Sequence, residues 1–299
     1  MSVPSPAAPD ARPEIVPLET LEETARRLRV DVVEMIARAG SGHPGGSLSA
    51  LDVILALYSG EMRFDPKAPK AEWRDRFVLS KGHGVPALYA VMAERGFFDR
   101  EELKGLRELG SSLQGHPANA LLPGIEASTG SLGQGLSVAQ GIALAGRLQG
   151  SQSEPAYRVY ALCGDGEIQE GQIWEVALSA PKLKLSNLCV FIDWNKAQID
   201  GLVEDVMPLM PLREKWEAFG WNVIEIDGHD YVEIRKSLDD ARAETERPTV
   251  ILAHTLKGKG AAYFESDIVG WHGKAPNAEE TERVIQEING INSSTGDAS

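Results

Sequence analysis

Apolar residues recur at three- and four-residue steps in the first third of the chain. This spacing is typical of a helix with one buried face. The pattern stops at Gly40, which predicts that the helix ends there. The apolar positions that define it are Leu21, Ala25, Leu28, Val32 and Ile36.

Two later positions carry the residue pairs that cap helices. Ser49 is followed three positions later by Asp52, and Asp99 by Glu102. In a capping box each of the two side chains satisfies a backbone N–H group at the helix N-terminus. We therefore expect a second helix to begin at Ser49 and a third at Asp99.

From about residue 157 the pattern changes to short β-rich runs separated by helical stretches. This alternation indicates an α/β fold, with a parallel β-sheet flanked by helices on both faces. Such sheets bind ligands at the carboxyl ends of their strands. The runs are YRVYALC (157–163), NLCVFID (187–193), WNVIEID (221–227) and TVILAHT (249–255).

Length and composition set the domain organisation. The chain has 299 residues, of which 42% are hydrophobic, and we expect one compact domain over residues 18–288. Residues 1–17 are rich in Pro and Ala, and residues 289–299 are small and polar. Both ends are therefore predicted to be flexible tails.

Charge and cysteine content narrow the class of protein. The net charge of −14 and the lack of a Lys/Arg run argue against a nucleic-acid partner or a membrane surface. The N-terminus has no apolar secretion signal, and no apolar stretch reaches the roughly 18 residues of a membrane span. Cys163 and Cys189 lie in apolar runs, which favours buried, reduced thiols and a cytoplasmic protein.

An unusual acidic residue follows the first of these runs. Asp165 stands between Gly164 and Gly166, where a dinucleotide-binding loop would keep its glycines free of an acidic side chain. Its carboxylate would repel a pyrophosphate unless a divalent cation lay between them, and Mg²⁺ takes carboxylate and phosphate oxygens in this way. Asn195 stands two positions after the next apolar run and can supply a second, neutral oxygen.

Five of the six histidines have a glycine neighbour. Glycine permits tight turns and close backbone approach, so we expect these histidines on loops that crowd a ligand. Histidine can also exchange protons with a hydroxylated, carbonyl-bearing substrate near neutral pH. The five are His43 in SGHPGG, His83 in KGHG, His116 in QGHP, His229 in DGHD and His272 in WHG.

The Gly-Asp-Gly motif, followed by Asn195 after a helix and an apolar strand, resembles the diphosphate-binding motif of thiamine diphosphate enzymes. Five further segments are similar to motifs of the transketolases and stand in that family's order, so the resemblance covers about residues 18–277. They are GSGHPGG (40–46), SKGHG (80–84), QGHP (114–117), STGSLGQG (128–135) and LKGKGAAYFESDIVGWHG (256–273).

The resemblance implies a thiamine diphosphate site that holds a metal ion. Asp165, the side chain of Asn195 and the main-chain carbonyl of Ala197 are the implied ligands of Mg²⁺ or Ca²⁺. Gly164 and Gly166 are implied to lie against the diphosphate.

The resemblance also implies the other site residues. His43, His116 and His272 should contact the hydroxyl and carbonyl oxygens of the sugar during carbon–carbon cleavage. Glu170 matches a glutamate that the family places near a subunit interface, and we count it with the catalytic residues. The residues expected to contact the cofactor are His83, His272, Gly130, Ser131 and Leu132.

The remaining polar residues of these segments are interpreted as structural. His229 stands in a turn before a helix, and His254 at the end of a strand. Lys257 and Lys259 could bind phosphate, but Gly/Lys loops are common, so this assignment stays open. The tryptophans at positions 174, 216 and 221 are expected to pack in the core.

In transketolases the glutamate that activates the aminopyrimidine, and most of the arginines that bind sugar phosphates, lie in a second domain downstream. The resemblance therefore implies the N-terminal subunit of a split transketolase, active only with a C-terminal subunit that carries the pyrimidine-binding and C-terminal domains. Such an enzyme transfers a two-carbon ketol unit from a ketose phosphate to an aldose phosphate, as in the pentose phosphate pathway. We expect a heterotetramer built on a homodimer of this subunit.

Two alternatives remain open at this point. One is a half-enzyme related to deoxyxylulose phosphate synthase, or a transketolase for an unusual sugar, because that wider group shares the DGHD, KGKG and WHG motifs. The other is a nucleotide-binding module without catalysis, based on the glycine-rich loop after a strand. Asp165 argues against the second alternative.

Overall fold

Five parallel strands form the central sheet of this computed structural model, which describes residues 15–290. Their order across the sheet is β1-β2-β3-β7-β6, and every neighbouring pair is parallel. Four of the five coincide with the runs predicted from the sequence. The strands are β1 (Arg76–Leu79), β2 (Val159–Gly164), β3 (Leu188–Trp194), β6 (Asn222–Asp227) and β7 (Thr249–His254).

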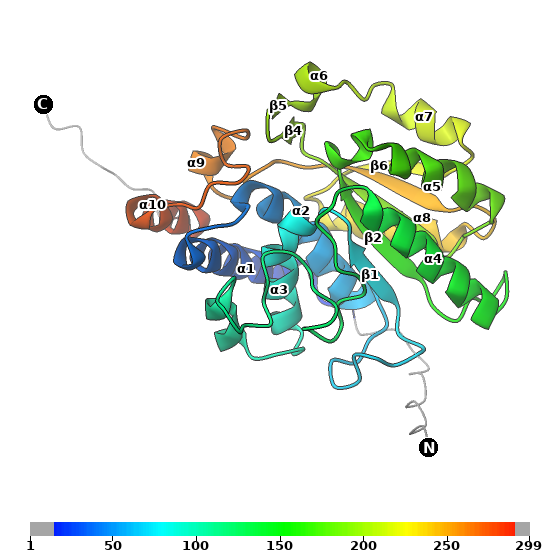
Figure 1. Ribbon diagram of the computed structural model, residues 1–299, viewed down its shortest axis with the longest axis horizontal. Coiled ribbons are helices and arrows are strands. Elements are labelled where there is room, and N and C mark those ends of the chain that lie inside the picture. The colour runs from blue at the N-terminus through cyan, green and yellow to red at the C-terminus, as the bar shows by residue number, and fades with distance from the viewer. Residues whose placement is uncertain (1–14, 291–299) are drawn as a thin grey trace, which may run out of the picture.

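Helices cover both faces of the sheet, as predicted (Figure 1). One face is covered by α1 (Leu18–Ala39), α2 (Pro44–Ala56), α3 (Val85–Glu94) and α8 (Tyr231–Ala243). The other face is covered by α4 (Gln134–Gln149), α5 (Gly171–Lys182) and α7 (Leu212–Ala218). The remaining elements are α6 (Val203–Val206), α9 (Ala262–Glu265), α10 (Ala278–Ile288) and the short pair β4 (Ala197–Gln198) and β5 (Gly201–Leu202).

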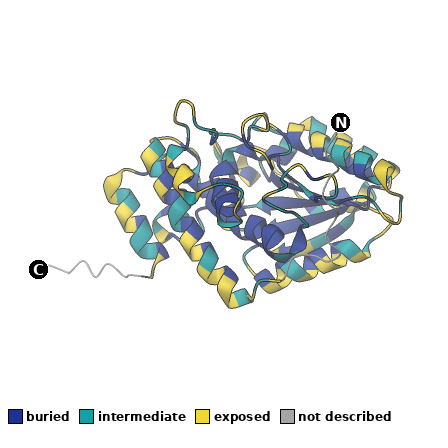
Figure 2. Cartoon of the chain, turned by 90° about the horizontal axis from the view of Figure 1, so that it is seen from below, coloured by how far each residue is buried: buried dark blue, intermediate teal, exposed yellow. Residues whose placement is uncertain are grey.

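Alternation along each strand divides the apolar side chains between two cores. In β3, Phe191 belongs to the core under α1, α2 and α3, whereas Val190 and Ile192 belong to the core under α4 and α5. Figure 2 shows that the sheet is buried and that exposed residues lie on the outer faces of the helices. Because both faces of the strands are covered, the sequence shows them as continuous apolar runs.

The first predicted helix is confirmed by α1. The helix ends at Ala39, and Gly40 then adopts a left-handed conformation with φ of 61°. The N–H group of Gly40 donates to the carbonyl of Ala37 at 3.1 Å, which satisfies one of the last helical acceptors.

The second helix begins earlier than predicted. Its first residue is Pro44, and both Ser49 and Asp52 lie inside it. Proline fits the first helical position because its φ is preset and the N–H group it lacks would have no helical partner there. The prediction of a start at Ser49 was wrong because Asp52 caps no helix end and instead forms a buried ion pair with Arg29.

The third predicted helix is confirmed only in part. Asp99 and Glu102 form the expected capping box, but it opens a 3₁₀ helix, η3 (Arg100–Gly105), and no α-helix. The sequence also showed no sign of β1, whose four residues are too few to show a period.

Several smaller predictions can be compared with the structure. Both cysteines are free and fully buried. Trp216 and Trp221 are buried and Trp174 is partly buried against them, as expected. Over residues 15–290 no helix is long and apolar enough to cross a membrane. Positions 1–14 and 291–299 of the two predicted tails lie outside the described residues.

Candidate functional site

Four of the glycine-flanked histidines lie together at the carboxyl ends of the strands. His43 is the N-cap of α2, and its ring centroid lies 5.2 Å from that of His83, 6.3 Å from that of His116 and 5.6 Å from that of His272. The rings of His83 and His272 are 5.3 Å apart. His43 and His272 therefore share one site although they are 229 positions apart in the sequence (272 − 43).

These four histidines are neutral at neutral pH. Burial, followed by repulsion from nearby cations, lowers the pKa of His43 to about 4 and that of His272 to about 3. Burial also holds the pKa of His83 well below its ordinary value and lowers the pKa of His116. A neutral imidazole has one donor and one acceptor nitrogen, so the cluster can both give and take hydrogen bonds with a sugar.

Asp165 and the turn after β3 form the second part of the site. The N–H group of Asp165 donates to the carbonyl of Asp193 at 3.2 Å, so the ends of β2 and β3 lie side by side. The Oδ2 atom of Asp165 accepts a bond from the N–H group of Lys196 at 2.5 Å. The N–H group of Ala197 donates to Oδ1 of Asn195 at 3.3 Å. Hydrogen bonds therefore join the three predicted metal ligands, with Asp165 in the loop after β2 and Asn195 and Ala197 in the turn after β3.

The environment of Asp165 suits a divalent cation. Burial, and then the negative charge of Asp193, raises the pKa of Asp165 to about 7. The hydrogen bonds to its carboxylate come from the backbone N–H groups of Gly166 and Lys196. A buried carboxylate without a direct cationic partner gains from a metal ion, and the neighbouring amide and carbonyl are oxygen donors of the type that Mg²⁺ and Ca²⁺ take.

Two orphaned polar atoms point to a ligand in the same region. Nδ1 of His43 and Oε1 of Gln198 are among the buried side-chain atoms of residues 15–290 that have no hydrogen-bond partner. Gln198 also lies close to the Gly-Asp-Gly turn, because a Cβ atom on Gly166 would be 3.0 Å from its Cβ. Buried polar atoms are rarely left unpaired, so a bound molecule is expected to reach them. In the described part of the chain, no three His, Cys, Asp or Glu side chains form a metal site, so the implied ligand set depends on the amide and the carbonyl.

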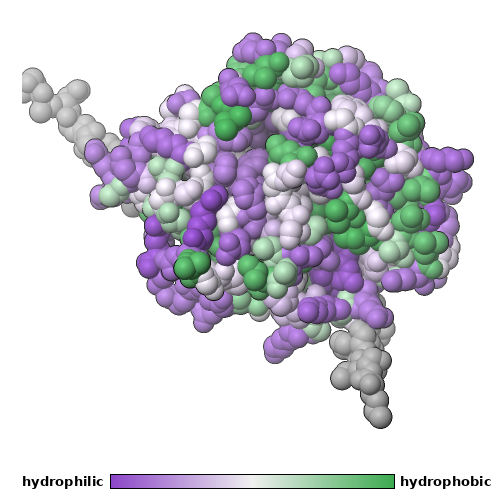
Figure 3. Space-filling view, in the orientation of Figure 1, coloured by the Kyte–Doolittle hydropathy of each residue, from purple (hydrophilic) through white to green (hydrophobic). Residues whose placement is uncertain are grey.

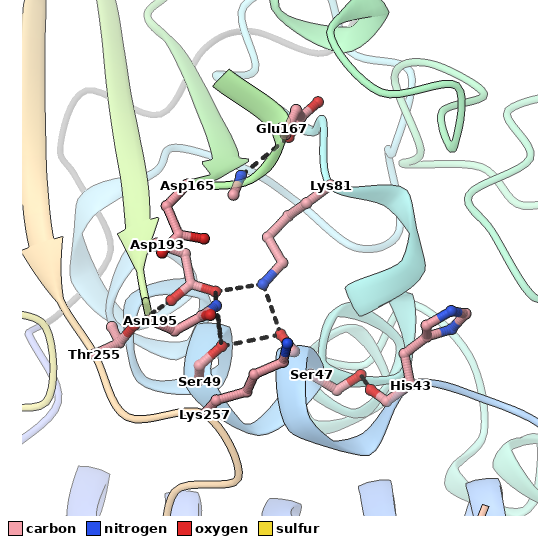
Figure 4. A network of polar contacts seen from close by, with 12 residues as sticks. His43, Ser47, Ser49, Lys81, Asp165, Glu167, Asp193, Asn195, Thr255 and Lys257 are labelled. Atoms are coloured by element: carbon pink, nitrogen blue, oxygen red, sulfur yellow. Dashed lines mark hydrogen bonds and ion pairs between the residues drawn. The ribbon is translucent and has the colours of Figure 1, made fainter. Parts of the chain in front are cut away.

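A buried ion pair that the sequence analysis missed lies beneath these residues (Figure 4). The Nζ atom of Lys81 donates to a carboxylate oxygen of Asp193 and, at 2.9 Å, to the carbonyl of Gly46. Asp193 also accepts bonds from the hydroxyl groups of Ser49 and Thr255. Burial opposes the charge of Asp193, but Lys81 and the hydroxyl groups outweigh it and hold the pKa of Asp193 below its ordinary value.

Glu167 was also missed by the sequence analysis. It is buried and accepts bonds from the hydroxyl of Ser80, the N–H group of Gly133 at 2.9 Å and that of Gly164 at 3.0 Å. These bonds join the loop before α4 to the Gly-Asp-Gly turn. Glu170, the glutamate selected from the sequence, is instead exposed at the N-terminus of α5, and its expected place near a subunit interface remains a prediction.

The loop predicted to contact the cofactor lies against the histidines. Gly130 has φ of 136°, and a Cβ atom there would come within 2.7 Å of the His116 ring, so only glycine fits. Ser131 is exposed and Leu132 is partly buried. The backbone of Gly130 thus lies directly against the ring of His116.

Lys257 connects the two parts of the site. Its side chain is 1% exposed, and its Nζ atom donates to the carbonyl of Ala197 at 2.9 Å and lies 2.8 Å from Nδ1 of His272. Burial and then Lys81 lower the pKa of Lys257 to about 8. Lys259 is partly exposed, so of the two lysines left open Lys257 is the one placed in the site.

The two histidines interpreted as structural lie outside the cluster. His254 is at the end of β7, where it stacks on Trp194 and bonds to Glu225. His229 lies in the turn before α8, and Asp230 caps that helix, as predicted. The ring of His229 has buried contacts that the sequence did not predict.

Comparison with known proteins places this geometry in a family. The chain matches the family model described as "Transketolase, thiamine diphosphate binding domain" over residues 20–295. The crystal structure of transketolase from Campylobacter jejuni superposes with a TM-score of 0.84 at 35% identity, covering 92% of this chain and 43% of that one. The protein is thus an α/β subunit of the thiamine diphosphate-binding class, and it belongs to the transketolase family.

The relatives fall into two groups by length. A subunit of an apulose-4-phosphate transketolase from Phocaeicola vulgatus is 43% identical, over 91% of this chain and 94% of that relative. A "6-deoxy-6-sulfo-D-fructose transketolase subunit SqwG" from a Clostridium species is 45% identical, over 83% and 89%. Human transketolase is 41% identical, but this chain covers 43% of its length. The prediction of an N-terminal subunit of the split type is confirmed.

Proposed function

We propose that this chain binds thiamine diphosphate with Mg²⁺ and transfers ketol units once a second subunit joins it. The supporting observation is the contact of Lys257 with both His272 and the carbonyl of Ala197. Through this contact the histidine cluster adjoins residues 195–197, whose backbone hydrogen-bonds to Asp165. The turn would then bind the metal ion and diphosphate, and the histidine cluster would bind the sugar, in one reaction centre.

Each part of the site has a proposed task. Asp165, the Asn195 side chain and the Ala197 carbonyl would hold the metal ion, and Gly164 and Gly166 would let the diphosphate approach the backbone. His83 would donate a hydrogen bond to the diphosphate. When bound, thiamine diphosphate supplies the electron sink that allows a bond next to a ketone to break.

The neutral histidines would handle the substrate. His43, His116 and His272 would each donate or accept a hydrogen bond with a hydroxyl or carbonyl oxygen of the sugar, because their low pKa values keep them uncharged, with one donor and one acceptor nitrogen each. Such hydrogen bonds would hold the sugar oxygens in place when a two-carbon unit leaves a ketose phosphate and joins an aldose phosphate.

A partner subunit would complete the site. The chain matches nearly the whole length of the Phocaeicola vulgatus relative but less than half of human transketolase. Large apolar side chains also stay exposed in the segment that follows residues 195–197, including Ile199 and Met210. Figure 3 shows apolar surface near the top of the molecule, where Figure 1 has β5 and α6. Exposed apolar patches of this kind mark protein contacts. We propose a C-terminal subunit with the pyrimidine-binding domain, in a heterotetramer.

The test is reconstitution with that second subunit. We expect no ketol transfer by the purified chain alone, transfer after the partner is added, and loss of transfer and of metal-dependent cofactor binding in Asp165→Asn. Asp240→Asn, an exposed aspartate on α8 that lies outside both the site and the apolar patch, is the matched control and should behave like the wild type. Ketol transfer by the chain alone would contradict the split-enzyme proposal.

The choice of sugar is a separate question. The two relatives of similar length are named for an apulose phosphate and a sulfonated deoxyfructose, so a transketolase for an unusual sugar stays a candidate. Product analysis of the reconstituted enzyme with ordinary and unusual ketose phosphates distinguishes the two. Transfer from an ordinary ketose phosphate at a much lower kcat/KM than from an unusual ketose would favour this second candidate.

A further inference from the structure

Asp52 is the centre of a buried polar network away from the histidine cluster. It lies inside α2 and is 2% exposed. Its Oδ2 atom accepts a bond from Nη2 of Arg29 at 2.6 Å and lies 2.7 Å from Nδ1 of His229, and its Oδ1 atom accepts the hydroxyl of Tyr231 at 2.7 Å. Three side chains from α1, the turn before α8 and α8 itself therefore meet on one carboxylate.

Two members of this network, His229 and Arg29, also bind the backbone of the loop formed by residues 256–259. The Nε2 atom of His229 accepts a bond from the N–H group of Leu256 at 2.8 Å. Since Nε2 is an acceptor there, the proton of the ring is on Nδ1, which donates to Asp52. Arg29 likewise uses Nε to donate to the carbonyl of Lys259 at 3.2 Å. Asp52 thus reaches both ends of residues 256–259 through one intermediate side chain each.

That loop carries Lys257 between its two held ends. The N–H group of Gly258 donates to the carbonyl of Gly45 at 3.1 Å, which fixes the middle of the loop to α2. From this backbone the side chain of Lys257 extends to the Ala197 carbonyl and to His272. The ring of His229 bonds instead to Asp52 and Leu256. The network therefore acts on the site through the backbone of the loop.

We propose that Asp52, Arg29 and His229 position Lys257 for the cofactor and metal, so that His229 is a positioning residue of this enzyme. This inference rests on the proposed function. Groups that orient a ligand of a metal or cofactor commonly affect its affinity by about 10- to 100-fold. The hydrogen bond from the Leu256 N–H group to Nε2 of His229, and not the bond from His229 to Asp52, is the contact that fixes the position of the loop.

Two substitutions of His229 separate those two bonds. Asparagine places its amide near Nδ1 and can donate to Asp52, but it has no atom that reaches Leu256. Glutamine places an amide oxygen near Nε2 and can accept the Leu256 N–H group, while Asp52 keeps Arg29 and Tyr231. If His229 served only to satisfy the buried charge of Asp52, His229→Asn would be harmless and His229→Gln harmful. Positioning of the loop predicts the reverse order.

The experiment has two readouts. Hydrogen exchange of the full chain without cofactor reports the amide of Leu256, which should exchange faster in His229→Asn and at the wild-type rate in His229→Gln. Calorimetry of the reconstituted enzyme with thiamine diphosphate and Mg²⁺ should give a Kd about 10-fold higher for His229→Asn and within about threefold for His229→Gln. His254→Asn, a histidine that also pairs with a carboxylate, is the control.

Arg29→Lys is a second variant, which tests the same loop if a His229 variant fails to fold. It keeps a cation for Asp52 and drops the bond to the Lys259 carbonyl, so loop exchange should again be faster. Equal behaviour of His229→Asn and the wild type in both readouts, or greater harm from His229→Gln, would overturn the inference. If the wild type bound no thiamine diphosphate, the proposed function would fail, while the exchange rates would still decide whether the network holds the loop.

Discussion

His43 shows how burial sets the chemistry of a single residue in this protein. Its pKa lies near 4 in the folded chain, compared with an ordinary value of 6.5, because its ring is half-buried and faces cationic side chains. The unfolded chain therefore binds a proton between these two pH values that the folded chain does not bind. The free energy of unfolding must fall as the pH drops from about 6.5 to about 4.

Replacing His43 tests this sign. His43→Asn removes one such group, so the free energy of unfolding should fall less steeply over the same pH range, by about 1 kcal/mol in total after allowance for solvent screening. Urea unfolding of the wild type and the variant at several pH values measures this difference. Parallel curves for the two proteins would show that His43 titrates normally in the folded state.

Sequence motifs identified the site residues that stand next to a glycine, such as the four histidines and Asp165. His43, His83, His116 and His272 were predicted to share a site, and the structure brings them together. Asp193 was hidden because one acidic residue at the end of an apolar run has no motif. Only the fold shows that Lys81, 112 positions away, neutralises it.

At the scale of elements, α2 shows why two adjacent glycines can stand inside a helix. A Cβ atom on Gly45 would lie 2.8 Å from the carbonyl oxygen of Trp271 and 2.9 Å from Cγ of Lys257. A Cβ atom on Gly46 would lie 3.2 Å from Nε2 of His83. The glycines therefore let the loop with Lys257 and the histidine rings pack directly on the helix backbone.

The two kinds of helical glycine in this chain predict opposite effects of alanine. Gly45→Ala should lower the free energy of unfolding by about 1 to 3 kcal/mol, since the backbone of Trp271 cannot yield easily. Gly141→Ala on α4, where a Cβ atom meets nothing within 4 Å, should raise it by about 0.5 to 1 kcal/mol. Chemical denaturation of both variants checks the pair, and stabilisation by Gly45→Ala would show that the close approach does not exist.

Strands were easier to predict than helix starts for a physical reason. A strand buried on both faces leaves a continuous apolar run that can be seen in the sequence, as in β2, β3 and β7. The start of α2 was misplaced because Asp52 has the residue type of a cap while its partners lie far away in the sequence. Local patterns cannot distinguish a cap from a buried ion pair.

Across the whole molecule, one ion pair joins elements that are distant in the sequence. Lys81 follows β1, Asp193 lies at the end of β3, and the Lys81 side chain also holds the backbone of α2 at Gly46. Removing one member of a buried pair leaves the other charge without compensation, which usually costs about 3 to 5 kcal/mol. The pair thus couples the helix layer to the sheet beneath the site.

A double-mutant cycle measures that coupling. Lys81→Met should lower the free energy of unfolding by about 3 to 5 kcal/mol, while Lys81→Met combined with Asp193→Asn should recover part of the loss. Denaturant unfolding of both single variants and the double variant gives the coupling energy. Additive losses would contradict a direct interaction between the two side chains.

The fold class and family membership follow from the sequence and are confirmed by the sheet and the comparisons. The single domain over residues 18–288, the metal ion and the role of each site residue stay predictions. The metal ion and the residue roles depend on a bound ligand and on contacts with a second subunit. The sequence of this chain alone does not specify those contacts.

The most direct test of the account is a crystal structure with thiamine diphosphate and Mg²⁺. We expect the metal ion to be coordinated by the carboxylate of Asp165, the amide oxygen of Asn195 and the carbonyl of Ala197, at distances of about 2.1 Å. A cofactor bound elsewhere, or a metal ion that none of these three oxygens contacts, would contradict the account.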